Sequence, residues 1–490
     1  MDLDLAPDLS AALAAATYTY DQVAELLGPD AHAALQRNET TPGLRRTADG
    51  SPLATLTRLF LLQTPVSLTA AEGALPGLVE RSVAAGLVDV DGDQVRALLD
   101  LRPYADDLLD LWVASDLTPG MDGTPYRTRP DHVLGVSSAS TSLAQLTIRD
   151  DVGSALDLGT GCGVQSLHLA EHADRVVGTD VNPRALALAR FTCALNGVEA
   201  DIRDGSLFEP VAGERFDLIV TNPPFVISPA TGERLVYRDS GMPGDQVVER
   251  IVRAAPGHLT DGGWCQILAN WAITDRPWDE RLGSWVTGAD AYAVQREVLD
   301  PAAYVEMWLK DSGAHPSTGG VPVSYRRRYD EWLGWLEAQG VQGIGFGWLN
   351  LHRTDASPRL SFTEWPYEVE QPIGAHVTGW HRDAEAAAAG ADALWATRLH
   401  LAADVVQETQ GAAGAEDPGT IVLRQQRGLR RAHQVDTVVA AVAGACDGDL
   451  PLGVIVDAVA QLTGAEPGPT RASCLGQLRE LVADGFLRPT

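Results

Sequence analysis

Four short apolar runs, each ending in small, acidic or amide residues, constrain the fold of this chain more than any other feature. The polar groups are, in chain order, Asp157 to Gly163, Asp180, Asp204 to Ser206 and Asn222 to Phe225. Segments with helical periodicity separate the runs, and this alternation is typical of a parallel, doubly wound sheet. Ligands of such sheets bind at the carboxyl ends of the strands, so the four groups predict a nucleotide-type site.

The apolar pattern predicts an α/β domain over residues 126–380. Strands are expected at 154–158, 175–179, 199–203, 216–221, 264–270, 291–298 and 341–351, and helices at 164–172, 183–195, 245–255 and 329–338. Residues 301–324 would be an insertion or a flexible lid between the last two strands.

The residues before this domain, 1–125, are expected to form a helical domain. A helix from Tyr20 ends at Gly28-Pro29, and residues 41–52 are expected to be a loop. Helices at 55–63, from Thr69 (with Glu72 at capping-box spacing) and at 78–85 precede a hairpin around Asp91-Gly92. This order is that of a winged helix, with protein or substrate docking favoured over nucleic-acid binding because the third helix carries little basic charge.

The last 110 residues, 381–490, are expected to form an α+β domain, with a second winged-helix-like module as one form that it could take. An Ala-rich helix is predicted at 383–396. Residues 405–408 and 420–425 are predicted to pair as strands around the loop 411–419.

The net charge of the chain indicates which class of binding partner it favours. The chain has 490 residues with 37 Lys+Arg and 66 Asp+Glu, a formal net charge of −29. The electrostatic field of such a negatively charged protein repels polyanions such as nucleic acids, unless basic residues are clustered at the binding surface. Two basic runs, 326–328 and 424–431, are placed to contact phosphates, but solvated faces are the more frequent explanation.

Metal sites and disulfides are not indicated. The five cysteines, at 162, 193, 265, 446 and 474, form no C-x-x-C pair, and the 11 histidines show no ligand spacing. The acidic N-terminus lacks the basic start of a signal peptide, and no apolar run reaches the ~20 residues of a membrane helix. These observations predict a soluble cytoplasmic protein without a bound metal, and they leave its oligomeric state open.

Two motifs carry the chemistry. The Gly159-x-Gly161-x-Gly163 turn lets the backbone approach a ligand, although a plain tight turn or a dinucleotide site (G-x-G-x-x-G) would also use glycines. Asp180 follows Asp157 by 23 residues, near the ~20-residue offset of a ribose-binding acid, although it could instead cap the next helix. In Asn222-Pro223-Pro224-Phe225 the prolines stiffen a strand end that presents an amide oxygen and a carbonyl.

Leu156 to Gly161 and Phe216 to Phe225, in this order and spacing, resemble class I S-adenosylmethionine (SAM) methyltransferases of the Asn-Pro-Pro-Phe/Tyr branch, which methylates planar nitrogens. The resemblance covers residues 154–271 and extends weakly to 353. These two motifs look most like those of the protein-glutamine methyltransferases that modify release factors. The same Asn-Pro-Pro-Phe/Tyr loop also serves adenine-N6 and guanine-N2 methyltransferases. The resemblance implies that the last strand is antiparallel and inserts beside its predecessors.

The resemblance also implies residue roles. The cofactor SAM would be bound by Asp157, Gly159, Thr160, Gly161, Gly163, Asp180, Val181, Asp204, Gly205, Ser206 and Asn222. Among these, Asp157 would attract the ammonium group and Asp180 would hold the ribose. Asp204 would accept the adenine amine, although a solvated loop carboxylate explains it equally well. The catalytic residues would be Asn222, Pro223 and Phe225, which hold and stack on the –NH₂ group that is methylated.

Two segments outside the motifs are expected near this site. Residues 126–148 would fold over the cofactor or serve as a connector, and residues 237–241 would line the substrate entrance or form an exposed turn.

The predicted function is therefore SAM-dependent N-methylation. A glutamine side chain or other peptide-type substrate is slightly favoured by the charge of −29. Adenine-N6 or guanine-N2 methylation of RNA or DNA is the alternative, and a small amine or amide metabolite stays open. A regulatory or scaffold protein that binds SAM without transfer is disfavoured by the intact Asn222. Hydrolysis is disfavoured because no Ser/His/Asp motif or metal cluster appears in the sequence.

Overall fold

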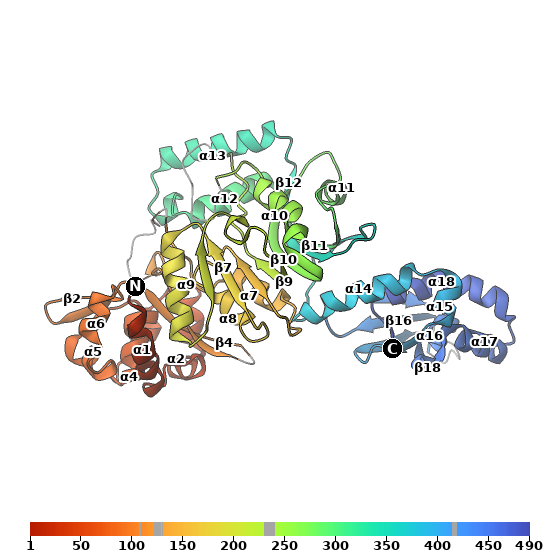
Figure 1. Cartoon of the computed structure of the whole chain (residues 1–490), viewed down its shortest axis with the longest axis horizontal. Helices are drawn as coiled ribbons and strands as arrows, with labels where there is room; N and C mark the ends of the chain where they lie inside the picture. Colours follow the sequence, from red (N-terminus) through yellow and green to blue (C-terminus); the bar gives the residue numbers. More distant parts are fainter. Residues whose placement is uncertain (107–108, 122–128, 130, 230–240, 414–418) are drawn as a thin grey trace. The chain divides into compact units, whose positions relative to one another are not determined.

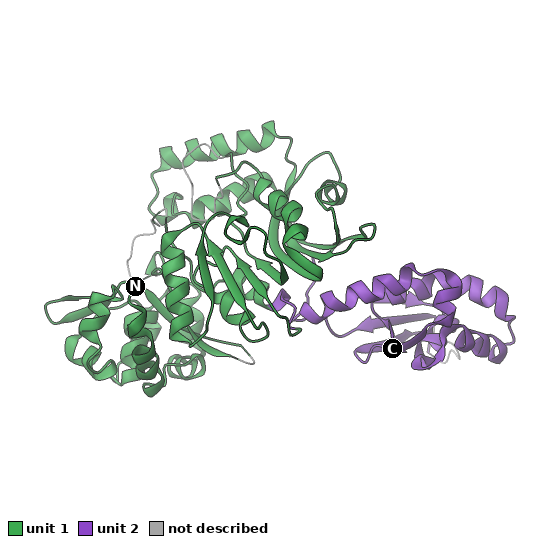
Figure 2. Ribbon diagram, in the orientation of Figure 1, with its two compact units in different colours: residues 1–144, 150–364 green, residues 145–149, 365–490 purple. Residues whose placement is uncertain are grey.

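The computed structural model describes residues 1–490 except 107–108, 122–128, 130, 230–240 and 414–418 (Figure 1). The chain divides into two compact units (Figure 2). The first contains Met1–Ala144 and Asp150–Glu364, and the second contains Gln145–Arg149 and Trp365–Thr490. The first unit thus holds both the expected N-terminal domain and the expected central sheet, whereas the boundaries at 125/126 and 380/381 stay predictions.

An eight-stranded sheet with the order β13-β11-β12-β10-β9-β6-β7-β8 forms the centre of the first unit. Its strands are β6 (Ala155–Leu158), β7 (Val176–Asp180), β8 (Asp201–Asp204), β9 (Phe216–Thr221), β10 (Leu259–Ile273), β11 (Ala289–Leu299), β12 (Gly343–Arg353) and β13 (Leu360–Glu364). Strands β6 to β10 run parallel, and β12 lies antiparallel between β10 and β11. The doubly wound sheet and the antiparallel last strand are therefore confirmed, while the edge strand β13 was not predicted.

Helices flank this sheet, and their buried apolar side chains belong to two separate hydrophobic clusters. The helices are α7 (Ser138–Leu146), α8 (Val164–Leu169), α9 (Pro183–Leu195), α10 (Gln246–Ala254) and α11 (Trp278–Gly283). Apolar side chains of α10 pack with buried residues of β6, β7 and β9, such as Leu156, Val177 and Ile219. Phe191 of α9 instead shares a core with α1 (Ala6–Ala15). The N-terminal residues therefore pack directly on a helix of the central domain.

The N-terminal part follows the expected order of three helices and a hairpin. It comprises α1, α2 (Tyr20–Leu35), α3 (Thr41–Arg46), α4 (Pro52–Leu56), a π-helical turn (Thr57–Leu61), β1 (Val66–Ser67), α5 (Leu68–Ala74), α6 (Val79–Ala84), β2 (Val88–Asp91), β3 (Gln94–Ala97), β4 (Asp100–Ala105) and β5 (Asp110–Ser115). Strands β1, β3 and β2 form a small antiparallel sheet. That this module is a winged helix stays a prediction.

Two local expectations for this part were wrong, and one is confirmed. The helix that begins at Tyr20 ends at Gly28 as expected, because the backbone of Gly28 is not helical (φ 69°, ψ 169°), and a second helical segment of α2 follows the kink and runs to Leu35. The expected loop 41–52 contains α3. The helix expected from Thr69 begins at Leu68, where the Ser67 hydroxyl caps it by accepting the N–H of Ala70.

The insertion between β11 and β12 is helical. It consists of α12 (Pro301–Asp311), a short 3-10 helix (Pro316–Thr318) and α13 (Pro322–Ala338), so residues 301–324, expected to be an insertion or a flexible lid, are an insertion of mostly regular structure. The side chain of Asp300 accepts the N–H groups of Ala302 and Ala303 and starts α12, with proline at the first position. Tyr304 and Trp332 are fully buried between the two helices and the sheet.

The second unit contains two small antiparallel sheets, β15-β16-β17 and β18-β14-β19. Its elements are α14 (Gly374–Ala388), α15 (Ala391–Ala396), β14 (Arg398–Leu401), β15 (Val405–Gln410), β16 (Thr420–Gln425), β17 (Ala432–Val435), α16 (Thr437–Ala445), β18 (Asp447–Pro451), α17 (Leu452–Leu462), α18 (Pro467–Ala483) and β19 (Leu487–Pro489). The expected pairing of 405–408 with 420–425 is confirmed. The Ala-rich helix expected at 383–396 is two helices, broken at Ala389-Gly390.

Two properties concern the whole chain. All five cysteines are buried free thiols. Among the described helices of both units, none combines the length and the apolar character required to cross a membrane.

Candidate active site

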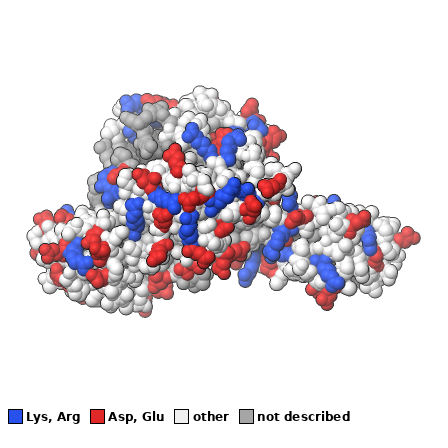
Figure 3. All heavy atoms as spheres, in the orientation of Figure 1, with Lys and Arg blue, Asp and Glu red and all other residues white. Residues whose placement is uncertain are grey.

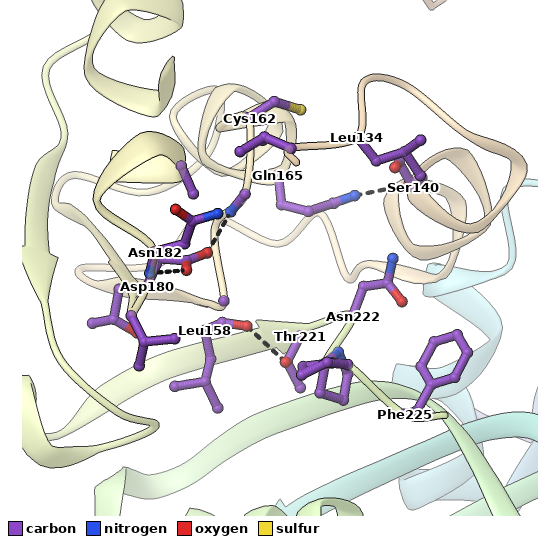
Figure 4. A pocket seen from close by; sticks show the side chains of 18 of the residues that line it. Leu134, Ser140, Leu158, Cys162, Gln165, Asp180, Asn182, Thr221, Asn222 and Phe225 are labelled. Atoms are coloured by element: carbon purple, nitrogen blue, oxygen red, sulfur yellow. Dashed lines mark hydrogen bonds between the residues drawn. The ribbon is translucent and has the colours of Figure 1, made fainter. Parts of the chain in front are cut away.

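A cavity of about 490 Å³ lies at the carboxyl ends of β6, β7, β8 and β9 (Figure 4). Of the residues singled out in the sequence, those that line it are Gly159, Gly161, Asp180, Val181, Gly205, Ser206, Asn222, Pro223 and Phe225. The described lining does not include Asp157, Thr160, Gly163 or Asp204. Four strand ends that are distant in sequence therefore do meet at one site, as the sheet topology requires.

The glycine loop after β6 leaves open space next to its backbone. Gly159 and Gly161 have positive φ values of 79° and 56°, and a Cβ on either would meet no atom within 4 Å. A Cβ on Gly163 would instead lie 3.1 Å from the Cα of Ala189 on α9. The first two glycines thus border the cavity, while the third allows α8 to approach α9.

Asp180 closes this loop from the end of β7. Its carboxylate accepts the N–H of Gly161 at 3.0 Å and the N–H of Asn182 at 2.8 Å (Figure 4). Burial raises the pKa of Asp180 above its usual range in spite of these hydrogen bonds and that of Val181. The side chain therefore lines the cavity with a carboxylate whose lone pairs are only partly used.

Asp157 is buried beside the glycine loop and is only 1% exposed. Its carboxylate accepts the hydroxyls of Thr160 at 2.6 Å and Ser166 at 2.7 Å. Burial raises its pKa from 3.8 to about 6 despite these two hydrogen bonds. The structure thus gives Asp157 and Thr160 a mutual contact that fixes the turn.

We expect Asp157→Asn to stabilise the protein near pH 7. The folded state holds the Asp157 proton more tightly than the unfolded chain, so this group's contribution to the free energy of unfolding is complete below about pH 4 and declines until about pH 6. Two pKa units correspond to about 3 kcal/mol as an upper bound. The side-chain oxygen of asparagine can still accept hydrogen bonds from Thr160 and Ser166. Because an amide does not ionise in this pH range, the variant avoids the cost of burying a charged carboxylate.

Urea unfolding of both proteins between pH 4 and pH 8 measures this effect. All other titrating groups cancel in the difference between the two proteins. Parallel pH profiles would show that the Asp157 carboxyl titrates as an ordinary exposed acid.

Residues 131–135 form one wall of the cavity and are held there by Asp116, just after β5. Asp116 accepts the guanidinium of Arg184 (Nε at 2.7 Å) and the N–H of Val133 at 2.7 Å. Burial acts to raise the pKa of Asp116, but the hydrogen bonds from Arg184 and Val133 outweigh it and the pKa lies below its usual range. The Nδ2 of Asn182 also donates to the carbonyl of Asp131 at 3.0 Å. Of residues 126–148, expected to fold over the cofactor or to serve as a connector, residues 131–135 therefore border the cavity, while residues 126–128 and 130 lie outside the described part of the chain.

The amide of Asn222 is the most informative group on the side of the cavity away from Asp180. Its Oδ1 is buried and accepts no hydrogen bond from any described residue. The preceding Thr221 donates its hydroxyl to the carbonyl of Leu158 at 2.7 Å, which ties the ends of β9 and β6 together. Figure 4 shows Asn222 and Phe225 on the side of the cavity away from Asp180. A buried oxygen without a partner is well placed to accept an N–H from a ligand.

The helical insertion supports the loop that contains Asn222. The N–H of Ile227 donates to the Tyr304 hydroxyl at 2.8 Å, and the Trp332 Nε1 donates to the Ile227 carbonyl at 2.9 Å. The ring of Phe225 meets that of Trp308 edge-on, with centroids 6.4 Å apart. The insertion thus fixes the chain that follows the two prolines.

Sequence reasoning missed several of these residues. Asp116 and Arg184 are 68 positions apart and belong to no motif, so only the tertiary structure joins them. Gln165, a buried amide in the cavity wall, lies two residues beyond Gly163 and outside the motif, so no sequence signal marks it. Of the expected entrance segment 237–241, only Gly241 belongs to the described residues.

Three family models match parts of this chain. The family model described as the methyltransferase small domain matches residues 135–282. Two further models, each described as a domain of unknown function, match residues 15–98 and 375–489.

Curated relatives match the same central region. A release factor glutamine methyltransferase of Geobacter sulfurreducens is 37% identical over 126 residues, which are 23% of this chain and 44% of that protein. A ribosomal RNA small subunit methyltransferase C of Alcanivorax borkumensis is 33% identical over 150 residues, which are 30% of this chain and 42% of that protein. The chain thus spans less than half the length of these relatives.

A solved T. thermophilus 16S rRNA N2 methyltransferase, in complex with AdoMet and guanosine, is 19% identical with a TM-score of 0.28, covering 47% of this chain and 60% of that one. The family model and the curated relatives identify the central part of the chain as a class I SAM-dependent methyltransferase domain. Residues 135–282 match the model of the methyltransferase small domain family, and SAM is the cofactor of this domain.

Proposed function

We propose that this protein is an N-methyltransferase that transfers the methyl group of SAM to a planar amide or exocyclic amine nitrogen. The observation that carries the proposal is the buried Oδ1 of Asn222, which has no hydrogen-bond partner among the described residues and lies in the same cavity as Asp180 and the glycine loop. The residues present fit SAM, because Gly159 and Gly161 leave room for a ligand and Asp180 offers acceptors to a ribose.

Asn222 and Pro223 would orient the nucleophile. An amide or aromatic amine is a weak nucleophile because its lone pair is delocalised. If the Asn222 Oδ1 and the Pro223 carbonyl each accept one N–H, the lone pair is left facing the cofactor. SAM supplies a methyl group activated by its sulfonium. Both oxygens also stabilise the positive charge that develops on the nitrogen, and such positioning is worth several orders of magnitude in rate.

Phe225 would complete the acceptor site. Its ring lies beside Asn222 at the cavity wall and is held edge-on by Trp308. A planar amide or base would stack on this ring, which fixes the plane of the nitrogen.

A glutamine side chain in a protein or peptide is the substrate that we favour. The acidic residues of the cavity wall are Asp131 and Asp180, and no Lys or Arg belongs to the described lining. Figure 3 shows acidic and basic side chains intermixed over the described part of the face in view. Arg424, within one of the two basic runs, is paired with Glu408. With a net charge of −29, these features suit a peptide better than a polyanion.

Methylation of a nucleobase is the second candidate, because ribosomal RNA methyltransferases are among the relatives. Incubation of the purified protein with methyl-tritiated SAM and fractionated cell lysate distinguishes the two. We expect label that is released by protease and resists ribonuclease. Label removed by ribonuclease would favour the nucleobase, and SAM binding without any transfer would favour a scaffold role. A glutamine-containing peptide and its asparagine counterpart then test the side chain.

We expect Tyr304→Phe to reduce the turnover of this reaction about tenfold while the dissociation constant for SAM stays the same. The change removes only the hydroxyl that accepts the Ile227 N–H, and leaving that buried donor without a partner loosens the loop by about 1–3 kcal/mol. Stopped assays and calorimetry measure the two quantities. Tyr329→Phe is the matched control, since the Tyr329 hydroxyl donates to Ala302 within the insertion. Equal losses in both variants would assign Tyr304 to general stability.

A further inference from the structure

Gln165 of α8 is a buried amide whose two ends have different environments. It lines the cavity and is 5% exposed. Its Nε2 donates to the carbonyl of Ser140 on α7 at 2.8 Å (Figure 4). Rotating the amide by 180° would place two oxygens against each other, so this contact fixes which end is the oxygen. The Oε1 is buried and has no hydrogen-bond partner among the described residues.

Of the other acceptor side chains near the cavity, Asp131 is paired with Arg129 at 3.0 Å, and the remaining lone pairs of Asp180 are those proposed to hold the ribose. Asp157, expected at the ammonium group of SAM, lies outside the described lining and accepts the Thr160 and Ser166 hydroxyls. Asp180 accepts two backbone N–H groups at the end of β7. The Asn222 Oδ1 has its part in holding the methyl acceptor. A cationic amino group in this cavity therefore still needs an acceptor.

We infer that Gln165 binds the amino group of SAM, with its Oε1 accepting a hydrogen bond from the ammonium. The site would thus recognise the methionine end of the cofactor by a neutral amide that Ser140 orients. The inference rests on the SAM-binding part of the proposed function and does not depend on the identity of the methyl acceptor. Gln165 would be a cofactor-binding residue, and Ser140 would position it.

A double-mutant cycle between protein and ligand tests the inference. The ligands are S-adenosylhomocysteine (SAH) and its analogue in which hydrogen replaces the amino group, and calorimetry gives both dissociation constants. In the natural protein we expect the analogue to bind about tenfold more weakly than SAH, as for a hydrogen bond to a charged group. In Gln165→Leu we expect the two ligands to bind within about threefold of each other.

Gln425→Leu is the matched control. Gln425 is 2% exposed, donates its Nε2 to the Asp484 carbonyl at 2.8 Å and also has a buried Oε1 without a partner among the described residues. It does not line the cavity, so the preference for SAH should persist in this variant. If Gln165→Leu does not fold, Gln165→Met retains the length of the side chain and is measured in the same way.

The outcomes separate the inference from the proposed function. An unchanged preference for SAH in Gln165→Leu would overturn the role of Gln165 while leaving SAM binding intact. Equal weakening of both ligands would assign Gln165 to the packing of α7 against α8 and would also overturn it. A natural protein that binds neither ligand would overturn the proposed function together with this inference.

Discussion

Asn222→Ala is expected to slow methyl transfer by about a hundredfold or more while the dissociation constant for SAH changes by less than about threefold. The buried Oδ1 of Asn222 has no partner among the described residues, so its removal breaks no hydrogen bond of the described chain. The loss should therefore fall on the orientation of the nucleophile and on the charge that develops on it. In the proposed site, cofactor binding would depend mainly on Asp180, the glycine loop and Gln165, which the change leaves in place.

Single-turnover transfer with saturating SAM and acceptor measures this rate, and calorimetry measures SAH binding. Asn270→Ala is a suitable control, because Asn270 on β10 is a buried amide that does not line the cavity. Asn222→Asp keeps an acceptor oxygen and should recover part of the rate. Turnover of Asn222→Ala equal to that of the natural protein would reject the catalytic role.

The sequence predicted elements well where their signals are local. Strand β9 and helix α9 have the expected bounds, because the Asn182 side chain and Pro183 start α9 and Asn196-Gly197 follows its end. The strand ends that line the cavity were likewise predicted, since a parallel sheet must bring them to one edge. A local signal was missed at Asp300-Pro301, which start a helix in the segment expected to be an insertion or a flexible lid.

The remaining features depend on contacts between distant residues. Asp116 and Arg184 join only when β5 packs beside α9, and no spacing rule links them. Gly163 and Asp157 belong to the motif, yet the structure engages them in packing against α9 and in holding Thr160. A motif therefore identifies the loop more reliably than the role of each residue in it. The side-chain oxygens of Gln165 and Asn222 indicate ligand contacts only because the structure shows that both are buried and have no hydrogen-bond partner among the described residues.

The second large effect is expected at Asp180. Asp180→Ala should raise the dissociation constant for SAH by about a hundredfold, because a carboxylate that accepts both ribose hydroxyls makes two charge-assisted hydrogen bonds. Asp180 also accepts the N–H groups of Gly161 and Asn182, so part of the loss would come from a disturbed glycine loop. Comparing methylthioadenosine with its 2′-deoxy form separates the two causes.

If Asp180 holds the ribose, the natural protein should prefer methylthioadenosine over the 2′-deoxy form by about tenfold, and Asp180→Ala should have almost no preference. If Asp180 only supports the loop, both ligands weaken together and the preference remains. Asp204→Ala is the matched comparison. Asp204 ends the neighbouring strand β8 but is exposed and outside the described lining, so a smaller change is expected there. An unaltered dissociation constant in Asp180→Ala would reject both roles, and the cavity would then have to bind its cofactor through the glycine loop and Gln165.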